Sequence, residues 1–140
     1  MDVHRAILAP LKTALAAIPS QATPPISPVP AERVFYNRRD SDAPYPHVWL
    51  RSENTAPGRP ATLVESTDFL MFDAWGRNRE EVDAIYKAAA KTIISTKVAH
   101  YGTAYNIVYF LNSVNILTEE DSLHLVCVFS ATYLESAITA

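Results

Sequence analysis

His124 and Cys127 are of types, and lie at a spacing, that could do chemistry. A thiol beside an imidazole base resembles an activated cysteine nucleophile. Both lie in the segment SLHLVCVFSATYLE, whose composition predicts a β-strand. On a strand, residues three apart point to opposite faces, so the imidazole would not reach the thiol. We therefore interpret Cys127 as a buried structural residue.

Acidic residues gather around the apolar segment FLMF, which Asp68 and Asp73 flank. A pair of carboxylates is a common basis for general acid and base catalysis, so a small enzyme that uses Asp73 stays an alternative. The alternating pattern favours a different role, in which Asp73 lies on a strand and meets a cross-strand partner. Glu80 and Glu81 fit the first turn of a helix, where negative charge is favourable.

Metal and nucleotide sites find no support elsewhere in the chain. The four histidines lack the short paired spacing of a metal site, and Cys127 is the single cysteine. The three glycines are too far apart for a glycine-rich phosphate loop. A formal charge of -3 also disfavours a general phosphate-binding surface. We predict no catalytic residue, no cofactor and no metal ion.

Two helices should position the rest of the chain. Apolar residues recur at helical spacing over 1–18, with Pro10 as a kink or a start. The second helix is expected over about 79–96, where Asn78 is a good N-cap and Glu81 follows three residues later, close to a capping box.

The segment 19–32 between the first helix and the sheet is rich in proline, since five of the ten prolines fall within 19–30. This composition favours an extended, semi-rigid connector. We expect it to be a spacer inside one domain that covers 1–140, with the sheet and helix core at 33–135.

Five strands are expected from runs of β-branched and aromatic residues bounded by turn residues. They are 33–37, 45–53, 62–76, 105–117 and 122–135. The order of strands and helices predicts an α+β fold, with an antiparallel-rich sheet of about five strands and two main helices packed on one face. Gly76 is expected to supply the backbone angles of the corner between the third strand and the second helix.

The last two expected strands are apolar on both faces. In the fifth strand, Leu125 and Cys127 lie opposite Val126 and Val128. In the fourth strand, the alternation places Tyr109 and Leu111 opposite a set formed by Val108, Phe110 and Val114. Two helices can cover only one face, so the pattern predicts a neighbouring subunit on the other. The alternative is that loops and the proline-rich connector fold over that second face.

Several residues are candidates for such an interface. Aromatic and arginine side chains are enriched at protein interfaces, and the turn-rich loop at 54–61 is expected to project from the domain. The candidates are Trp49, Arg51, Pro57, Gly58, Arg59, Trp75 and Arg77.

The order of these motifs resembles the small tail-completion, or tail-terminator, proteins of long-tailed bacteriophages and gene transfer agents, in the head-tail joining group. The resemblance covers about 33–135 and is carried by the motifs RVFY, PYPHVWL and FDAWGRNREEVDAI, followed by a closing hairpin. The proline-rich segment is longer than in compact versions of this pattern. It could instead form an arm that embraces a neighbouring subunit.

The resemblance implies a structural virion protein without catalysis. Its subunits would form a ring, typically a homohexamer, that caps the tail tube and docks it to the neck, with DNA passing through the lumen unread. The partners would be further copies of the chain, the tube protein and a neck protein. A stopper or adaptor protein of the neck is the alternative within this class.

The first twenty residues are too polar for a membrane span and match a signal peptide poorly. We therefore expect no membrane partner, assembly in the host cytoplasm and a final place in the virion, at the tail and neck.

Overall fold

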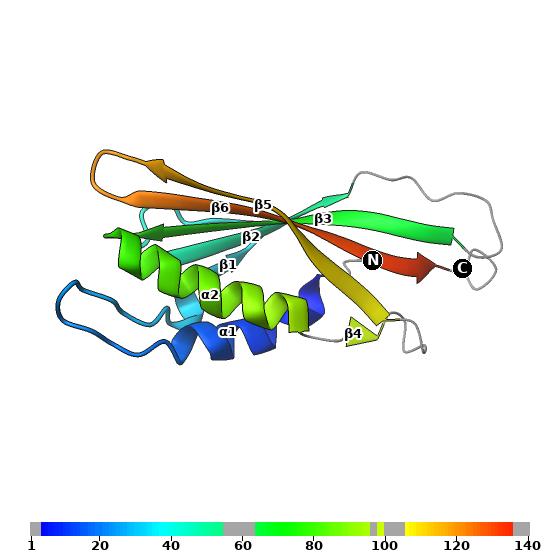
Figure 1. Cartoon of the computed structure of the whole chain (residues 1–140), viewed down its shortest axis with the longest axis horizontal. Helices are drawn as coiled ribbons and strands as arrows, with labels where there is room; N and C mark the ends of the chain where they lie inside the picture. Colours follow the sequence, from blue (N-terminus) through cyan, green and yellow to red (C-terminus); the bar gives the residue numbers. More distant parts are fainter. Residues whose placement is uncertain (1–3, 55–63, 96–97, 100–105, 136–140) are drawn as a thin grey trace.

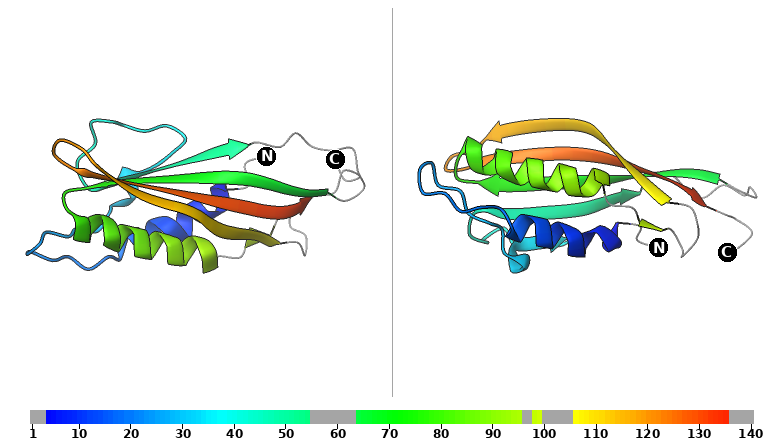
Figure 2. Two further views of the ribbon diagram at one scale, coloured as in Figure 1. Left: turned by 45° about the horizontal axis from the view of Figure 1, so that its top comes forward. Right: turned by 60° about the horizontal axis from the view of Figure 1, so that its bottom comes forward.

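The structure is a computed structural model, which describes residues 4–54, 64–95, 98–99 and 106–135. Two α-helices lie on one face of a six-stranded sheet (Figure 1). The predicted α+β class is therefore confirmed, as is the packing of both helices on the same face (Figure 2).

The helices and strands match the predicted segments closely, apart from one short strand. Five strands lie within two residues of their predicted bounds at each end, while the two-residue strand β4 was not predicted. The helical elements are η1 (Arg5–Ile7), α1 (Leu8–Ala16), η2 (Ala31–Arg33) and α2 (Arg79–Ser95). The strands are β1 (Val34–Tyr36), β2 (His47–Asn54), β3 (Val64–Gly76), β4 (Val98–Ala99), β5 (Asn106–Thr118) and β6 (Leu123–Glu135).

The sheet has the strand order β1-β2-β3-β6-β5-β4. All neighbouring strands are antiparallel except β1 and β2, which are parallel, so the sheet is mixed but mainly antiparallel. The parallel pair arises because residues 37–46 carry the chain back to the end of the sheet where β1 began. Asn37 ends β1 with a φ of 63°, a left-handed conformation that asparagine tolerates better than most residues.

The core lies between the sheet and the helices. Alternate residues of β2, β3 and β6 point toward the helices, and the apolar stripes of α1 and α2 pack onto them. The fully buried members with large side chains are Ile7, Leu11, Leu15, Leu50, Leu70, Phe72, Ile85, Ile93, Leu125 and Phe129. Burial of such side chains contributes on the order of 2 kcal/mol each, which makes this layer the main source of stability.

The N-terminal helix is shorter than predicted. A 3₁₀ turn precedes α1, and Pro10 lies in its first turn, where the missing N–H has no intrahelical partner to lose. Its stripe of Leu11 and Leu15 faces the core, together with Ile7 from the preceding turn.

The proline-rich connector is not extended as predicted. It folds back on itself through a two-way backbone bridge between Gln21 and Ile26, with both N–H···O distances at 2.9 Å. Its far end then docks on the start of α2, because Asn78 Nδ2 donates to the carbonyl of Pro25 at 2.7 Å. The connector is therefore part of the helix layer.

Glu81 holds this corner together from a fully buried position. Its carboxylate accepts the backbone N–H groups of Ser27 and Arg77, each at 2.9 Å, and forms an ion pair with the Arg77 guanidinium. Burial alone would raise the pKa of Glu81, but the hydrogen bonds from Arg77 and Ser27 outweigh it and hold the pKa below its ordinary value. The same pair raises the pKa of Arg77.

The predicted N-cap is confirmed, since Asn78 Oδ1 accepts the backbone N–H of Glu81 at 2.9 Å. The reciprocal half of a capping box is absent at this helix, because the Glu81 carboxylate accepts the N–H of Arg77 in place of that of Asn78. Gly76 is needed for space and not for an unusual backbone angle. A Cβ there would lie 2.8 Å from Cγ1 of Val82.

Candidate interaction surface

The sheet face opposite the helices is the candidate surface, and we call it the open face. It is formed by the residues of each strand that alternate with the core residues. Its central members are Trp49, Arg51, Phe69, Met71, Asp73, Trp75, Val108, Phe110, Asn115, Leu117, His124, Val126, Val128 and Ser130. Of the described segments, only the loop of residues 37–46 rises on this side, at one end of the sheet (Figure 2).

Three stacked side chains, which we call the aromatic row, cross the open face at that end. The pairing of β2, β3 and β6 places His47, Trp75 and His124 next to one another. The ring centroids of His47 and Trp75 are 4.9 Å apart, and those of Trp75 and His124 are 4.2 Å apart. Both pairs are close to parallel, so the aromatic row is a continuous stack across three strands.

Arg39 covers this stack from the loop. Its guanidinium carbon lies 3.6 Å from the centroid of the Trp75 ring, a close cation–π contact. Its Nη2 lies 3.4 Å from Nε2 of His47, and because arginine can only donate, His47 accepts there. The Nδ1 of His47 then donates to the carbonyl of Pro44 at 3.3 Å. Burial, together with the nearby Arg39 charge, lowers the pKa of His47, so the ring is held neutral.

Asp73 lies beside the aromatic row and is almost fully buried, with 1% of its side chain exposed. One oxygen forms an ion pair with Arg51 Nη2 at 3.0 Å, and the other lies 3.2 Å from Nε2 of His124. Arg51 also lies over the ring of Trp49, with its guanidinium carbon 4.3 Å from the ring centroid. The predicted role of Asp73 as a strand residue with cross-strand partners is confirmed.

The turn between β5 and β6, residues 119–122, closes the row from the other side. The Nε1 of Trp75 donates to Glu119 Oε1 at 3.1 Å, and Nδ1 of His124 lies 3.2 Å from the same oxygen. His124 therefore has a carboxylate at each ring nitrogen, one from β3 and one from the turn. This network fixes the turn against the sheet.

The predicted site residues divide into three groups. Trp49, Arg51 and Trp75 lie together on the open face, as proposed for an interface. Arg77 does not, because its guanidinium is engaged with Glu81 and Ser27 at the corner below the sheet. The candidates Pro57, Gly58 and Arg59 lie outside the described residues.

Sequence reasoning missed four contributors to this surface, which are Arg39, His47, Glu119 and His124. His47 and His124 both lie at the start of a strand, which is compatible with a contact between them. The sequence does not show that contact, because it depends on the strand register. Arg39 and Glu119 come from turns, and no strand pattern locates them.

The prediction that His124 and Cys127 face opposite sides of their strand is confirmed. His124 lies on the open face, whereas Cys127 is fully buried on the helix side. Burial, with a smaller contribution from the Asp73 charge, raises the pKa of Cys127 to about 12, so the thiolate is disfavoured. Within the described part of the chain, no group of three His, Cys, Asp or Glu side chains is placed to hold a metal ion.

Away from the aromatic row, the surface becomes apolar and exposed along β5. Val108, Phe110 and Leu117 on the open face are 48%, 57% and 50% exposed. The register shift between Leu111 and Ser113 changes the alternation, so Val114 pairs with Cys127 and points to the helix side. The predicted placement of Val114 beside Val108 and Phe110 is therefore wrong.

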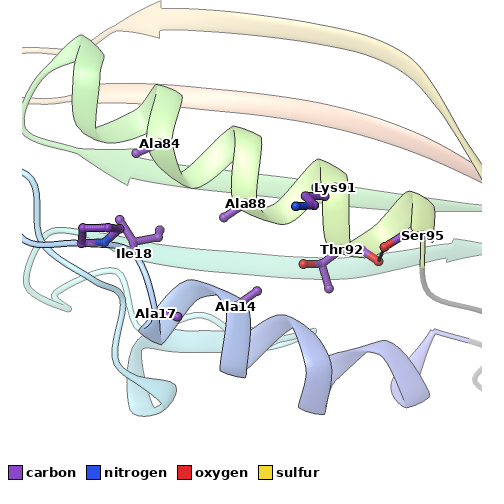
Figure 3. Close-up of a pocket in the computed structure, with 9 residues that line it drawn as sticks. Ala14, Ala17, Ile18, Ala84, Ala88, Lys91, Thr92 and Ser95 are labelled. Atoms are coloured by element: carbon purple, nitrogen blue, oxygen red, sulfur yellow. Dashed lines mark hydrogen bonds between the residues drawn. The ribbon is translucent and has the colours of Figure 1, made fainter.

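A second surface feature is an open groove of about 460 Å³ between α1 and α2 (Figure 3). Most of its lining side chains are small, with Ala14 and Ala17 on the α1 side and Ala84 and Ala88 on the α2 side. Lys91 is the charged residue at the groove. The polar residues that line the groove, Lys91, Thr92 and Ser95, all come from α2, so polar groups do not converge on it from several elements.

A scan against protein-family models and a search of curated proteins found no match to this chain. Among the described helices, none is long and apolar enough to cross a membrane.

Proposed function

We propose that this protein is a structural subunit of a bacteriophage or gene-transfer-agent tail. Copies of it form a ring, a homohexamer in this proposal, that terminates the tail tube and joins the tail to the neck. The observation that carries the proposal is the helix-free face of the sheet, whose part along β5 is apolar and exposed. A contiguous apolar surface of this kind is unusual on a lone soluble subunit and typical of one that packs against neighbours.

The engagement of the polar groups on the open face also supports a structural role. The Asp73 carboxylate is buried between Arg51 and His124. The Cys127 thiol is buried on the other side of the sheet. An acid and base pair needs a carboxylate that can reach a substrate, and Asp73 is enclosed by its own partners.

Electron microscopy of particles that lack this protein tests the proposal. Loss of a tail terminator should give overlong tails, or tails that are not joined to heads. Leaking heads beside tails of normal length would overturn it and would identify a stopper or adaptor of the neck. Expression of the wild-type chain from a plasmid should restore normal particles and is the control.

The enzymatic alternative is tested with Asp73→Asn, a change that keeps the shape of the side chain. If the protein is structural, Asp73→Asn should alter folding or assembly, and no catalytic activity should be lost. A hydrolytic or transfer activity of the wild-type protein that disappears in a correctly folded Asp73→Asn variant would overturn the proposal.

A further inference from the structure

Among the described residues, no strand pairs with the outer edge of β5 over most of its length. The strand pairs with β6 on one side, while β4 covers the other side only at Ile107 and Asn106. Within the described part of the chain, residues 110–118 have no strand beside them on this side, over roughly 31 Å at about 3.4 Å per residue.

This edge also lacks the features that normally protect an edge strand. No residue of Asn106–Thr118 is charged and none is proline, whereas exposed edges are usually blunted by lysine, proline or shortness. Of the six exposed large hydrophobic residues among those whose burial the structure describes, five lie on it. They are Val108, Phe110, Leu111, Val114 and Leu117.

The helix layer covers this strand only in part, because Tyr109 on its helix side is buried whereas Leu111 and Val114 on the same side are 36% and 38% exposed. Helices pack about 10 Å apart and strands about 4.8 Å apart, so two helices cover about four strands. Ile94 on α2 is 51% exposed at the limit of that layer. The strand therefore offers an edge and two flanks to a partner.

The two sides of the sheet carry opposite charge. Residues 4–46, which include α1, the edge strand β1 and the loop 37–46, contain five Lys or Arg residues and three acidic residues. Residues 106–135, which form β5 and β6, contain four acidic residues and no Lys or Arg. Two copies placed head to tail would bring a positive edge against a negative one, whereas two copies joined through the same edge would not.

The register places these charges at the same end of the sheet. Val34 of β1 pairs with Val48, which pairs with Ala74, then Leu125 and finally Ile116 of β5. Arg33, which directly precedes Val34, therefore lies at the same end as the acidic turn 119–122. Because β1 and β5 run in opposite directions, copies with a common orientation would meet as an antiparallel pair.

We propose that the β5 edge of one copy docks on the β1 edge of a second copy, head to tail, with the acidic turn 119–122 facing Arg33 of the neighbour. This inference rests on the proposed function in taking such contacts to close into a ring, which heterologous contacts do when the rotation closes. Phe35 of the neighbour would then lie opposite Asn115, since both pair at the level of Asp73.

Disulfide crosslinking of the purified full chain tests the docking. Cys127 is buried, so it leaves the background unreactive. The double variant Phe35→Cys with Asn115→Cys should give a ladder of crosslinked copies under oxidation, and each single variant should stay uncrosslinked. Dimers from Asn115→Cys or Ser113→Cys alone would overturn the proposal, because they indicate pairing of identical edges. Monomer in all variants would overturn it as well.

A charge exchange tests the orientation independently. Glu120→Lys or Arg33→Glu alone should weaken self-association about three- to tenfold, and the two together should restore it. Equal weakening by both changes without recovery in the pair would overturn the contact.

The tail phenotype separates this inference from the proposed function. Crosslinked ladders together with normal tails in particles that lack the protein would leave the docking standing and overturn the terminator role. Defective tails without any crosslinked ladder would overturn the docking and leave the terminator role standing.

Discussion

Single residues at the corner between β3 and α2 make contacts that tolerate little change. Gly76 ends β3 directly above Val82, and Glu81 lies buried beside both. A close-packed site of this kind cannot accept extra volume without moving a neighbour.

We expect Gly76→Ala to destabilise the protein by about 1–3 kcal/mol, as overpacking of a well-packed core usually does. The new methyl group would lie 2.8 Å from Cγ1 of Val82. Urea unfolding measures the change. In a Val82→Ala background, which removes the clashing methyl group, the same substitution should cost much less. An equal cost in both backgrounds would point to the backbone conformation and not to space.

His47 makes stability depend on pH. Burial, with the adjacent Arg39, lowers its pKa in the folded protein below the ordinary value of 6.5. The unfolded chain therefore binds more protons as the pH falls through that region, so stability is complete above pH 6.5 and declines toward the folded pKa. The slope for one proton is at most about 1.4 kcal/mol per pH unit.

Replacing the titrating ring by a ring that cannot titrate isolates this contribution. In His47→Phe the aromatic stack is retained, and the pH dependence just below 6.5 should flatten. Thermal or urea unfolding at a series of pH values measures it. An unchanged slope in the variant would assign the proton uptake to another group.

The residues of the surface differ in how far the sequence predicts them. The alternation around Asp73 and the aromatic content of β2 and β3 place Trp49, Arg51 and Trp75 on one face. The meeting of His47 with His124 across Trp75 depends on the pairing of strands far apart in the chain. Local pattern contains no information on that register, so the aromatic row is visible only in the fold.

At the scale of elements, the helix layer depends on a tie between segments distant in sequence. The connector joins α1 to the sheet, and its turn is held to the start of α2 by Glu81, Asn78 and Arg77. The proline content indicates a stiff connector, but its direction is set by where these acceptors and donors lie. The extended spacer was predicted wrongly for that reason.

Glu81→Gln should lower the free energy of unfolding by about 2–3 kcal/mol, because the variant loses charge-assisted hydrogen bonds at a buried site. The neighbouring Glu80→Gln, at an exposed position of the same helix turn, is the matched control and should change little. Chemical denaturation at neutral pH measures both.

The stabilising contribution of the Glu81 contacts should decrease as the pH falls. The pKa of Glu81 in the folded protein is held below its ordinary value of 4.5, so its contribution is present above pH 4.5 and is lost as the pH falls through the folded pKa. Glu81→Gln should therefore remove part of the acid destabilisation. If Glu81→Gln and the control Glu80→Gln changed the acid destabilisation equally, the role of the buried carboxylate would be contradicted.

At the scale of the whole molecule, the helices, five of the six strands and the unfinished face follow from apolar periodicity. The strand β4 and the parallel direction of β1 do not, because a two-residue pairing and a return loop leave no periodic signal. Coverage of the second face by loops, the alternative to a neighbour, is limited in the described segments to the end near Arg39. The remaining apolar surface motivates a prediction about assembly.

We expect the melting temperature to rise with protein concentration, because association stabilises the folded state by mass action. At a concentration about 100 times the dissociation constant, this stabilisation is about 2.7 kcal/mol. The double variant Phe110→Lys with Leu117→Lys should keep the fold and lose the concentration dependence, since both side chains are at least half exposed. Calorimetry at several concentrations measures it.

The control adds the same charges elsewhere. Ser20→Lys with Ala22→Lys, at exposed positions of the connector, should retain the concentration dependence of the wild-type chain. A melting temperature independent of concentration in the wild-type protein would contradict self-association in this range.

The strand order has a consequence for synthesis. The strand β6 pairs with β3 on one side and β5 on the other, at the centre of the sheet, yet it is the last described strand that the ribosome makes. Until it emerges, β3 and β5 have no common partner, and Phe72 and Leu70 lack the strand beside them. The nascent chain can pair β2 with β3 early, but β3 stays unpaired on its other side until β6 is made. Folding through such long-range pairing is slow. A chain stalled before β6 should bind chaperones, and one stalled after it should be released from them.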